Sequence, residues 1–103
     1  MDSFKVTTQE TSNSKILKFE VNQFITQHQS FEFNNIDEAK ASPLAQQLFY
    51  LPFVKKVYIT SNFIAIERFS IVEWEDVQNE VSQQIEEYLN KGNVVINQDI
   101  APK

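Results

Sequence analysis

The stretch SPLAQQLFYLPFVKKVYITSNFIAIERF, residues 42–69, decides the fold class because it predicts a helix, a tight corner and a hairpin in succession. Ser42 suits a helix N-cap, and Pro43 suits the first helical position, where its missing N–H costs nothing. The apolar residues that follow at helical spacing are Leu44, Ala45, Leu48, Phe49 and Leu51. Pro52 then ends the helix, because proline cannot continue the backbone hydrogen-bond ladder.

Two alternating segments follow this helix and predict a β-hairpin. In residues 53–59 Val57 and Ile59 share a face opposite Lys56 and Tyr58, and in residues 63–69 Ile64 and Ile66 point inward. The intervening TSN, residues 60–62, is short enough to reverse the chain between two antiparallel strands. The second half of the stretch is therefore a hairpin that the helix can cover.

Three further strands are predicted before the helix. Residues 4–10 are rich in β-forming residues, residues 15–25 begin with a clear two-residue alternation, and residues 30–35 place Phe31 and Phe33 on one face. Residues 36–41, IDEAKA, fit either a loop or a helical turn.

A second, longer helix is predicted after the hairpin. Ser70 followed by Glu73 fits a capping box, and Gly92, the single glycine, fits a left-handed C-cap. The apolar stripe between them consists of Trp74, Val77, Val81, Ile85, Tyr88 and Leu89. The order β-β-β-α-β-β-α predicts an α+β two-layer sandwich with a mainly antiparallel sheet and two helices on one face. We expect one domain over residues 1–93, with residues 94–103 as a C-terminal extension or linker stub.

Composition excludes several classes of function. The 103-residue chain has a formal net charge of −5, which disfavours nucleic acid as a partner. No apolar run approaches the ~20 residues of a membrane helix, and the N-terminus has no signal-peptide layout, so we expect a cytoplasmic protein. The chain has no cysteine, which excludes disulfides, thiolate metal sites and thiol nucleophiles within it. Its single histidine, His28, excludes the usual histidine-based metal clusters.

No residue stands out as a catalyst or a metal ligand. Ser42 has no nearby base and is interpreted as a helix cap, and His28 lies in a polar connection where we expect a solvated side chain. Trp74 belongs to the apolar stripe and is expected in the core. The acidic residues of the last helix, Glu75, Asp76, Glu80, Glu86 and Glu87, are interpreted as a solvated face. We therefore predict no catalytic, cofactor-binding or metal-binding residue in this chain.

Four residues are candidates for contact with a partner protein. Tyr50 and Phe53 lie at the corner after the first helix, where Phe53 is either buried under the sheet or exposed as a contact patch. Lys56 and Tyr58 lie on the polar face of the sheet, which a two-layer fold leaves uncovered. These residues define the predicted docking sites.

The order and spacing of short motifs resemble the N-terminal domain of Nfu/NifU-like iron–sulfur scaffold proteins, from about residue 4 to residue 92. The matching residues are Thr11, Asn13, Lys18, Phe19, Ser42, Pro43, Leu44, Ala45, Leu48, Phe49, Val54, Val57, Phe63, Ile64 and Trp74. The sequence departs from the family pattern at Ser14, where proline is usual, and at Phe53, where glycine is typical. Proteins that look like this continue into a Cys-x-x-Cys domain that holds the cluster, so we expect an excised domain that binds no cofactor itself.

The resemblance implies a non-catalytic accessory domain of an iron–sulfur scaffold or carrier protein. The expected partners are proteins, namely a cluster donor, a client apo-protein or the adjoining cluster-binding domain, and the domain itself is expected to be a monomer. Two alternatives stay open. One is a stand-alone structural or dimerising module that uses exposed strand edges. The other is a small hydrolase or isomerase that uses carboxylates and Ser42.

Overall fold

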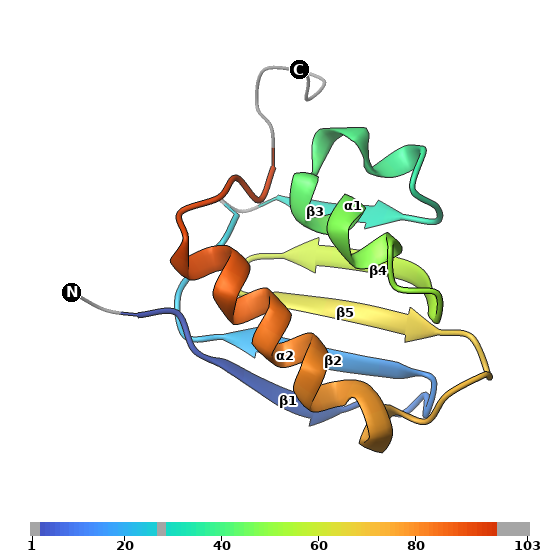
Figure 1. The fold of residues 1–103 in the computed structure, drawn as a ribbon. Helices are drawn as coiled ribbons and strands as arrows, with labels where there is room; N and C mark the ends of the chain where they lie inside the picture. Colours follow the sequence, from blue (N-terminus) through green and yellow to red (C-terminus); the bar gives the residue numbers. More distant parts are fainter. Residues whose placement is uncertain (1–2, 27–28, 97–103) are drawn as a thin grey trace.

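The computed structural model describes residues 3–26 and 29–96 and shows a five-stranded antiparallel sheet (Figure 1). The strands are β1 (Val6–Glu10), β2 (Ile16–Val21), β3 (Ser30–Phe33), β4 (Val54–Thr60) and β5 (Phe63–Arg68). Their order across the sheet is β1-β2-β5-β4-β3, so β5 pairs with β2, which lies far from it in the sequence. The predicted α+β fold with an antiparallel sheet is confirmed.

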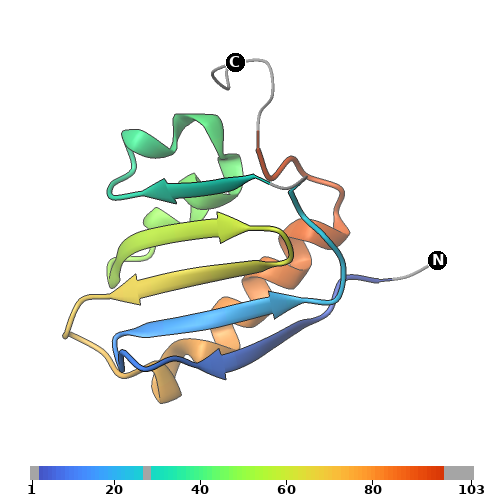
Figure 2. The same ribbon diagram turned by 180° about the vertical axis from the view of Figure 1, so that it is seen from behind.

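Both α-helices cover one face of the sheet and leave the other face open (Figures 1 and 2). They are α1 (Pro43–Phe49) and α2 (Trp74–Asn90). Residues 36–41, left open between loop and helical turn, contain the 3₁₀ helix η1 (Glu38–Ala41). The helices bury the apolar side of the central strands, where Phe19, Ile59 and Ile64 are fully inaccessible to solvent. Two-residue alternation along these strands therefore decides which side chains form the core.

The start of α2 differs from the sequence prediction. The helix begins at Trp74 with Glu73 as its N-cap, and no side chain caps it, so the predicted capping box of Ser70 and Glu73 is wrong. Instead, the carboxylate of Glu73 accepts a hydrogen bond from Arg68 at 3.2 Å. Arg68 is only 6% exposed because the alternation of β5 points it inward, and Glu73 neutralises this buried charge. At the other end of α2, Gly92 has a φ of 78°, as predicted for a left-handed C-cap.

The outer edge of β1 is partly covered by α2. The backbone N–H of Val6 donates to the carboxylate of Glu86 at 2.8 Å, and the N–H of Phe4 donates to the Asn90 side chain at 2.8 Å. These N–H groups point away from β2 and are the donors that an added strand would need. Their occupation weakens the alternative of a module that dimerises through this edge.

The segment after α2 packs back onto the domain. The hydroxyl of Tyr88 donates to the carbonyl of Val94, and the hydroxyl of Ser42 donates to the carbonyl of Val95 at 2.7 Å. Val95 also packs against the core. The predicted boundary at residue 94 stays a prediction, since residues 97–103 lie outside the described part of the chain.

Tyr88 provides a prediction about stability at high pH. Burial raises the pKa of its phenol above the usual value of 10.0, so folding favours the neutral form. The unfolded chain therefore loses this proton first, and stability falls as pH rises above about 10. We expect Tyr88→Phe to lower the free energy of unfolding by about 1 kcal/mol at pH 7 through the lost hydrogen bond. Urea titrations from pH 7 to 11 should show a shallower loss for Tyr88→Phe, and parallel curves would contradict this account.

Candidate docking surface

Three connections meet at the end of the fold that lies to the right in Figure 1. They are the β1–β2 turn, the α1–β4 corner and the β5–α2 connection. The N–H of Phe69 donates to the carbonyl of Phe53 at 2.8 Å, and the N–H of Arg68 donates to the carbonyl of Lys15 at 3.0 Å. Backbone hydrogen bonds therefore hold these connections in fixed positions, and side chains on them form one surface.

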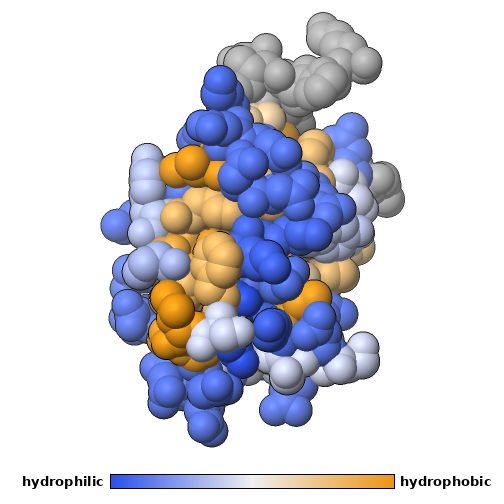
Figure 3. Space-filling view, turned by 90° about the vertical axis from the view of Figure 1, so that its right-hand side faces the viewer, coloured by the Kyte–Doolittle hydropathy of each residue, from blue (hydrophilic) through white to orange (hydrophobic). Residues whose placement is uncertain are grey.

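This end exposes large hydrophobic side chains. Tyr50 is 73% exposed, Phe69 is 45% exposed and Ile71 is 68% exposed. Figure 3 views this end directly and shows hydrophobic residues gathered in a band on the side of the helices. We call Tyr50, Phe69 and Ile71 the end patch. Apolar side chains grouped in this way mark interaction surfaces more often than scattered ones do.

Phe53 is buried, which decides between the two predicted alternatives of burial under the sheet and exposure as a contact patch. It is 7% exposed, and its ring meets that of Trp74 edge to face, with centroids 6.1 Å apart and planes at 90°. Trp74 makes a second such contact with Phe19 at 5.6 Å, so its predicted place in the core is confirmed. At this corner Tyr50 is the large hydrophobic side chain that stays exposed, so of the two candidates there it is the one accessible to a partner.

Lys56 and Tyr58 lie elsewhere, on the open face of the sheet seen in Figure 2. The Lys56 ammonium lies 3.0 Å from the Glu32 carboxylate, and this hydrogen bond with its negative charge raises the pKa of Lys56. Tyr58 neighbours the ring of Phe63, and Lys18 lies 4.3 Å above that ring. The structure therefore does not bring the four predicted contact residues together.

Sequence reasoning missed Phe69 and Ile71. Phe69 continued the alternation of the hairpin strand, and Ile71 lay between two elements without belonging to either pattern. The sequence did contain one indication that Ile71 is exposed. It is a large apolar residue outside every predicted apolar stripe, so no predicted element would bury it. Tyr50, the third residue of the end patch, lies some twenty residues away in the sequence, so only the fold shows that all three lie at the same end.

Ser42 lies inside the protein. Its side chain is fully buried, accepts a hydrogen bond from the N–H of Ala45 at 3.1 Å and donates to the carbonyl of Val95. The hydroxyl is thus occupied as a helix cap, as predicted. His28 lies outside the described residues. Within residues 3–26 and 29–96, no three acidic, histidine or cysteine side chains are grouped to hold a metal ion, and no helix is long and apolar enough to cross a membrane.

Comparison with known proteins identifies relatives over almost the whole chain. Residues 6–92 match the family model described as the N-terminal part of the scaffold protein Nfu/NifU. A protein of Drosophila sechellia named NFU1 iron–sulfur cluster scaffold homolog, mitochondrial, is 32% identical over 96 residues, which is 92% of this chain. A NifU-like protein of Schizosaccharomyces pombe is 30% identical over 94% of this chain. The chain spans 34% and 38% of these two relatives.

Solved structures share the fold. The solution structure of a NifU-like protein from Saccharomyces cerevisiae has a TM-score of 0.80 and 27% identity, and covers 93% of this chain and 87% of its own. The crystal structure of protein SAV1430 from Staphylococcus aureus has a TM-score of 0.67 at 19% identity, covering 80% of this chain and 99% of its own. The second similarity concerns the fold alone.

Proposed function

This chain belongs to the Nfu/NifU N-terminal family, and on that premise we propose that it is a non-catalytic, protein-docking domain of an iron–sulfur scaffold or carrier protein. The observation that carries the proposal is the family match over residues 6–92 in a chain that has no cysteine. Iron–sulfur clusters are held mainly by cysteine thiolates, which this chain lacks. The domain would contribute a surface, while a separate Cys-x-x-Cys domain would hold the cluster.

The end patch is the surface that we propose for docking. Aromatic and large aliphatic side chains supply most of the binding energy at protein interfaces, and Tyr50, Phe69 and Ile71 offer both kinds on a fixed backbone. The proposed partner is a cluster donor, a client apo-protein or the adjoining cluster-binding domain. A short flexible linker raises the effective concentration of a tethered site to about the millimolar range, so weak docking is sufficient. The open sheet face with Lys56 and Tyr58 is the second choice, because Lys56 is already paired with Glu32.

The remaining parts of the proposal concern the oligomeric state, the absence of catalysis and the cellular compartment. We propose that the domain acts as a monomer without catalysis of its own, since the Ser42 hydroxyl is occupied and the β1 edge is partly covered. The sequence predicted a cytoplasmic location, whereas several curated relatives carry mitochondrial names. Cell fractionation distinguishes the two compartments.

Competition in a cluster-transfer assay tests the docking proposal. A full-length scaffold of this family transfers its cluster to an apo-protein while this chain is added in excess. We expect the chain to slow the transfer, because it occupies the partner surface that the scaffold's own N-terminal domain uses. The double variant Tyr50→Ala with Ile71→Ala should need at least about thirty times more protein for the same inhibition, because each anchor contributes roughly 1 kcal/mol or more.

The matched control is Phe24→Ala. Phe24 is 72% exposed in the β2–β3 connection at the opposite end of the sheet, so its removal should leave inhibition unchanged. Inhibition that is absent, or that survives in the double variant, would contradict docking through the end patch. A stoichiometric chromophore after anaerobic addition of ferrous iron and sulfide to this chain would contradict the absence of a cluster.

A further inference from the structure

Arg68 is a buried charge at the end of β5, next to the end patch. Of the nine lysine and arginine residues in the chain, it is the single arginine. Its side chain is 6% exposed, whereas the side chain of its partner Glu73 is 66% exposed. A buried guanidinium group requires acceptors around it, because it has five N–H donors that have left water.

The guanidinium group of Arg68 has weak and incomplete partners. Its Nη1 donates to the carbonyl of Phe69 at 3.3 Å, and its Nη2 donates to one carboxylate oxygen of Glu73 at 3.2 Å. Both distances exceed the range of about 2.7–2.9 Å that is typical of charge-assisted N–H···O bonds. The buried Nε–H has no hydrogen-bond partner among the described residues. An unpaired buried donor is costly, so a further acceptor would stabilise this group.

The unpaired donor lies on the edge of the guanidinium group that Glu73 already uses. The Nε–H and one N–H of Nη2 point in the same direction, and together they match the two oxygens of a carboxylate. Glu73 reaches this edge with a single oxygen, so it forms only one of the two hydrogen bonds of a bidentate pair. The edge therefore suits a carboxylate that approaches it more directly than Glu73 does.

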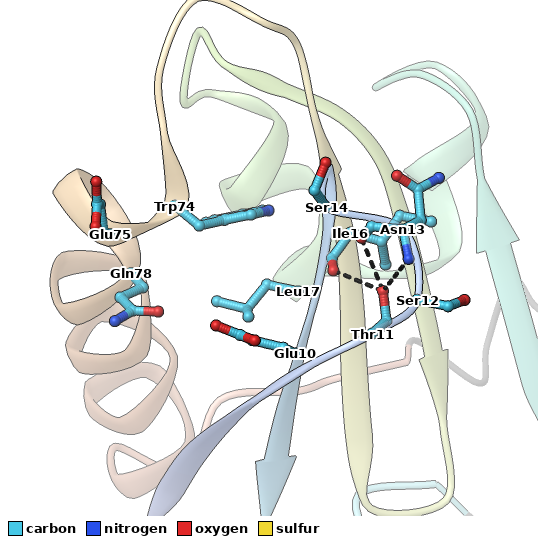
Figure 4. Close-up of a pocket in the computed structure, with 10 residues that line it drawn as sticks. All are labelled: Glu10, Thr11, Ser12, Asn13, Ser14, Ile16, Leu17, Trp74, Glu75 and Gln78. Atoms are coloured by element: carbon cyan, nitrogen blue, oxygen red, sulfur yellow. Dashed lines mark hydrogen bonds between the residues drawn. The ribbon is translucent and has the colours of Figure 1, made fainter.

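Backbone contacts explain why Glu73 does not approach more closely. The carbonyl of Lys15 accepts from the backbone N–H of Arg68 at 3.0 Å and from the indole N–H of Trp74 at 2.9 Å. Figure 4 shows this indole extending from the start of α2 toward the β1–β2 turn. The connection between Arg68 and Trp74 is thus held at both ends, which restricts the positions that the Glu73 carboxylate can take.

We propose that an acidic side chain of the docking partner replaces Glu73 on Arg68 and pairs with both Nε–H and Nη2. Phe69 and Ile71 of the end patch lie between Arg68 and Glu73 in the chain, so the site adjoins that patch. The partner segment therefore carries a carboxylate beside large apolar side chains. This inference rests on the proposed docking role and names the chemistry that the end patch selects.

The exchange keeps the charge at Arg68 balanced. The partner's carboxylate neutralises the buried guanidinium group, while Glu73, already two-thirds exposed, becomes fully hydrated. The remaining repulsion comes from Glu75 and Asp76 in the first turn of α2, and the positive end of the helix dipole offsets part of it. Salt screens more distant charges beyond about 8 Å at physiological ionic strength, so the net charge of −5 mainly slows the approach of an acidic partner.

Chemical rescue tests whether the site accepts an external carboxylate. Glu73→Ala removes the internal partner of Arg68, and small carboxylates can then take its place. We expect about 0.3 M sodium acetate to raise the melting temperature of this variant by about 3 °C more than sodium chloride of equal ionic strength. The unmodified chain should show a difference below about 1 °C, because Glu73 competes. Equal effects of acetate and chloride on Glu73→Ala would overturn the proposal.

The Nε–H of Arg68 provides a direct signal, since a chain with one arginine gives one such NMR resonance. In Glu73→Ala, N-acetyl-glutamate amide should shift this resonance saturably, and uncharged N-acetyl-glutamine amide should not. This measurement involves no cluster transfer, so it separates a failure of this inference from a failure of the docking role. A resonance that does not respond, or that saturates at a lower concentration of inorganic phosphate than of the glutamate probe, would overturn the acidic partner.

The competition assay then distinguishes recognition from a structural role of the ion pair. Glu73→Ala should lower the amount of chain needed for half inhibition about fivefold, because no internal carboxylate competes for Arg68. Glu80→Ala is the matched control: it removes the same charge from an exposed position of α2 and should change this amount by less than about twofold. If Glu73 only held the connection in place, its removal would weaken inhibition, and that result would contradict the proposal.

Discussion

Phe53→Ala is expected to lower the free energy of unfolding by about 3–5 kcal/mol, because it removes a buried ring from the core and leaves a cavity. The ring is 7% exposed and meets Trp74 edge to face, so the substitution also removes an aromatic contact. Domains of this size are stable by only about 5–15 kcal/mol. Urea denaturation followed by circular dichroism measures the change.

Tyr50→Ala is the matched comparison, since Tyr50 lies three residues away at the same corner but is 73% exposed. Its effect on stability should stay within about 0.5 kcal/mol. If Phe53→Ala does not fold, Phe53→Leu provides a milder change of about 1.5 kcal/mol or less. A small effect of Phe53→Ala together with a large effect of Tyr50→Ala would reverse the assignment and make Phe53 the contact residue.

These two residues show what sequence alone could predict about the candidate site. The corner was correctly placed at residues 50–53, but the helix ends at Phe49, so Leu51 lies in the corner and not in the helix as predicted from Pro52. Which ring is buried there depends on the packing of Trp74, which lies about twenty residues further along the chain. The strand β4 begins only at Val54, and its pairing with β5 shifts in register between Val54 and Lys56, so no local pattern decided the orientation of Phe53.

The fold was more predictable than the site because its elements are encoded locally. Alternation in β2, β4 and β5 assigned their inner faces correctly, and three- and four-residue spacing located both helices. The pairing of β2 with β5 is a tertiary interaction that no short window contains. The capping box failed for another reason: the Glu73 side chain is engaged by Arg68, five residues earlier in the chain, whose burial is decided by the fold.

Ser42→Ala is expected to lower the free energy of unfolding by about 2 kcal/mol, more than the loss of an exposed helix cap. The substitution removes the acceptor for the N–H of Ala45, which costs about 1 kcal/mol at a typical N-cap. It also removes the donor to the carbonyl of Val95, and the loss of one such partner costs roughly another 1 kcal/mol. Denaturant titration measures the total, and hydrogen exchange at residues 93–96 shows whether the segment after α2 is released.

Ser70→Ala is the matched control, because the sequence predicts both serines as helix caps while the structure makes only Ser42 one. Ser70 is exposed and does not cap α2, so its replacement should change stability by less than about 0.5 kcal/mol. Equal effects of the two substitutions would contradict the structure at the start of α2. Loss of cluster-transfer competition in Ser42→Ala without loss of stability would show that the Ser42 hydroxyl acts in function and not in folding. Because that hydroxyl already holds two backbone partners, we expect its effect to be on stability alone.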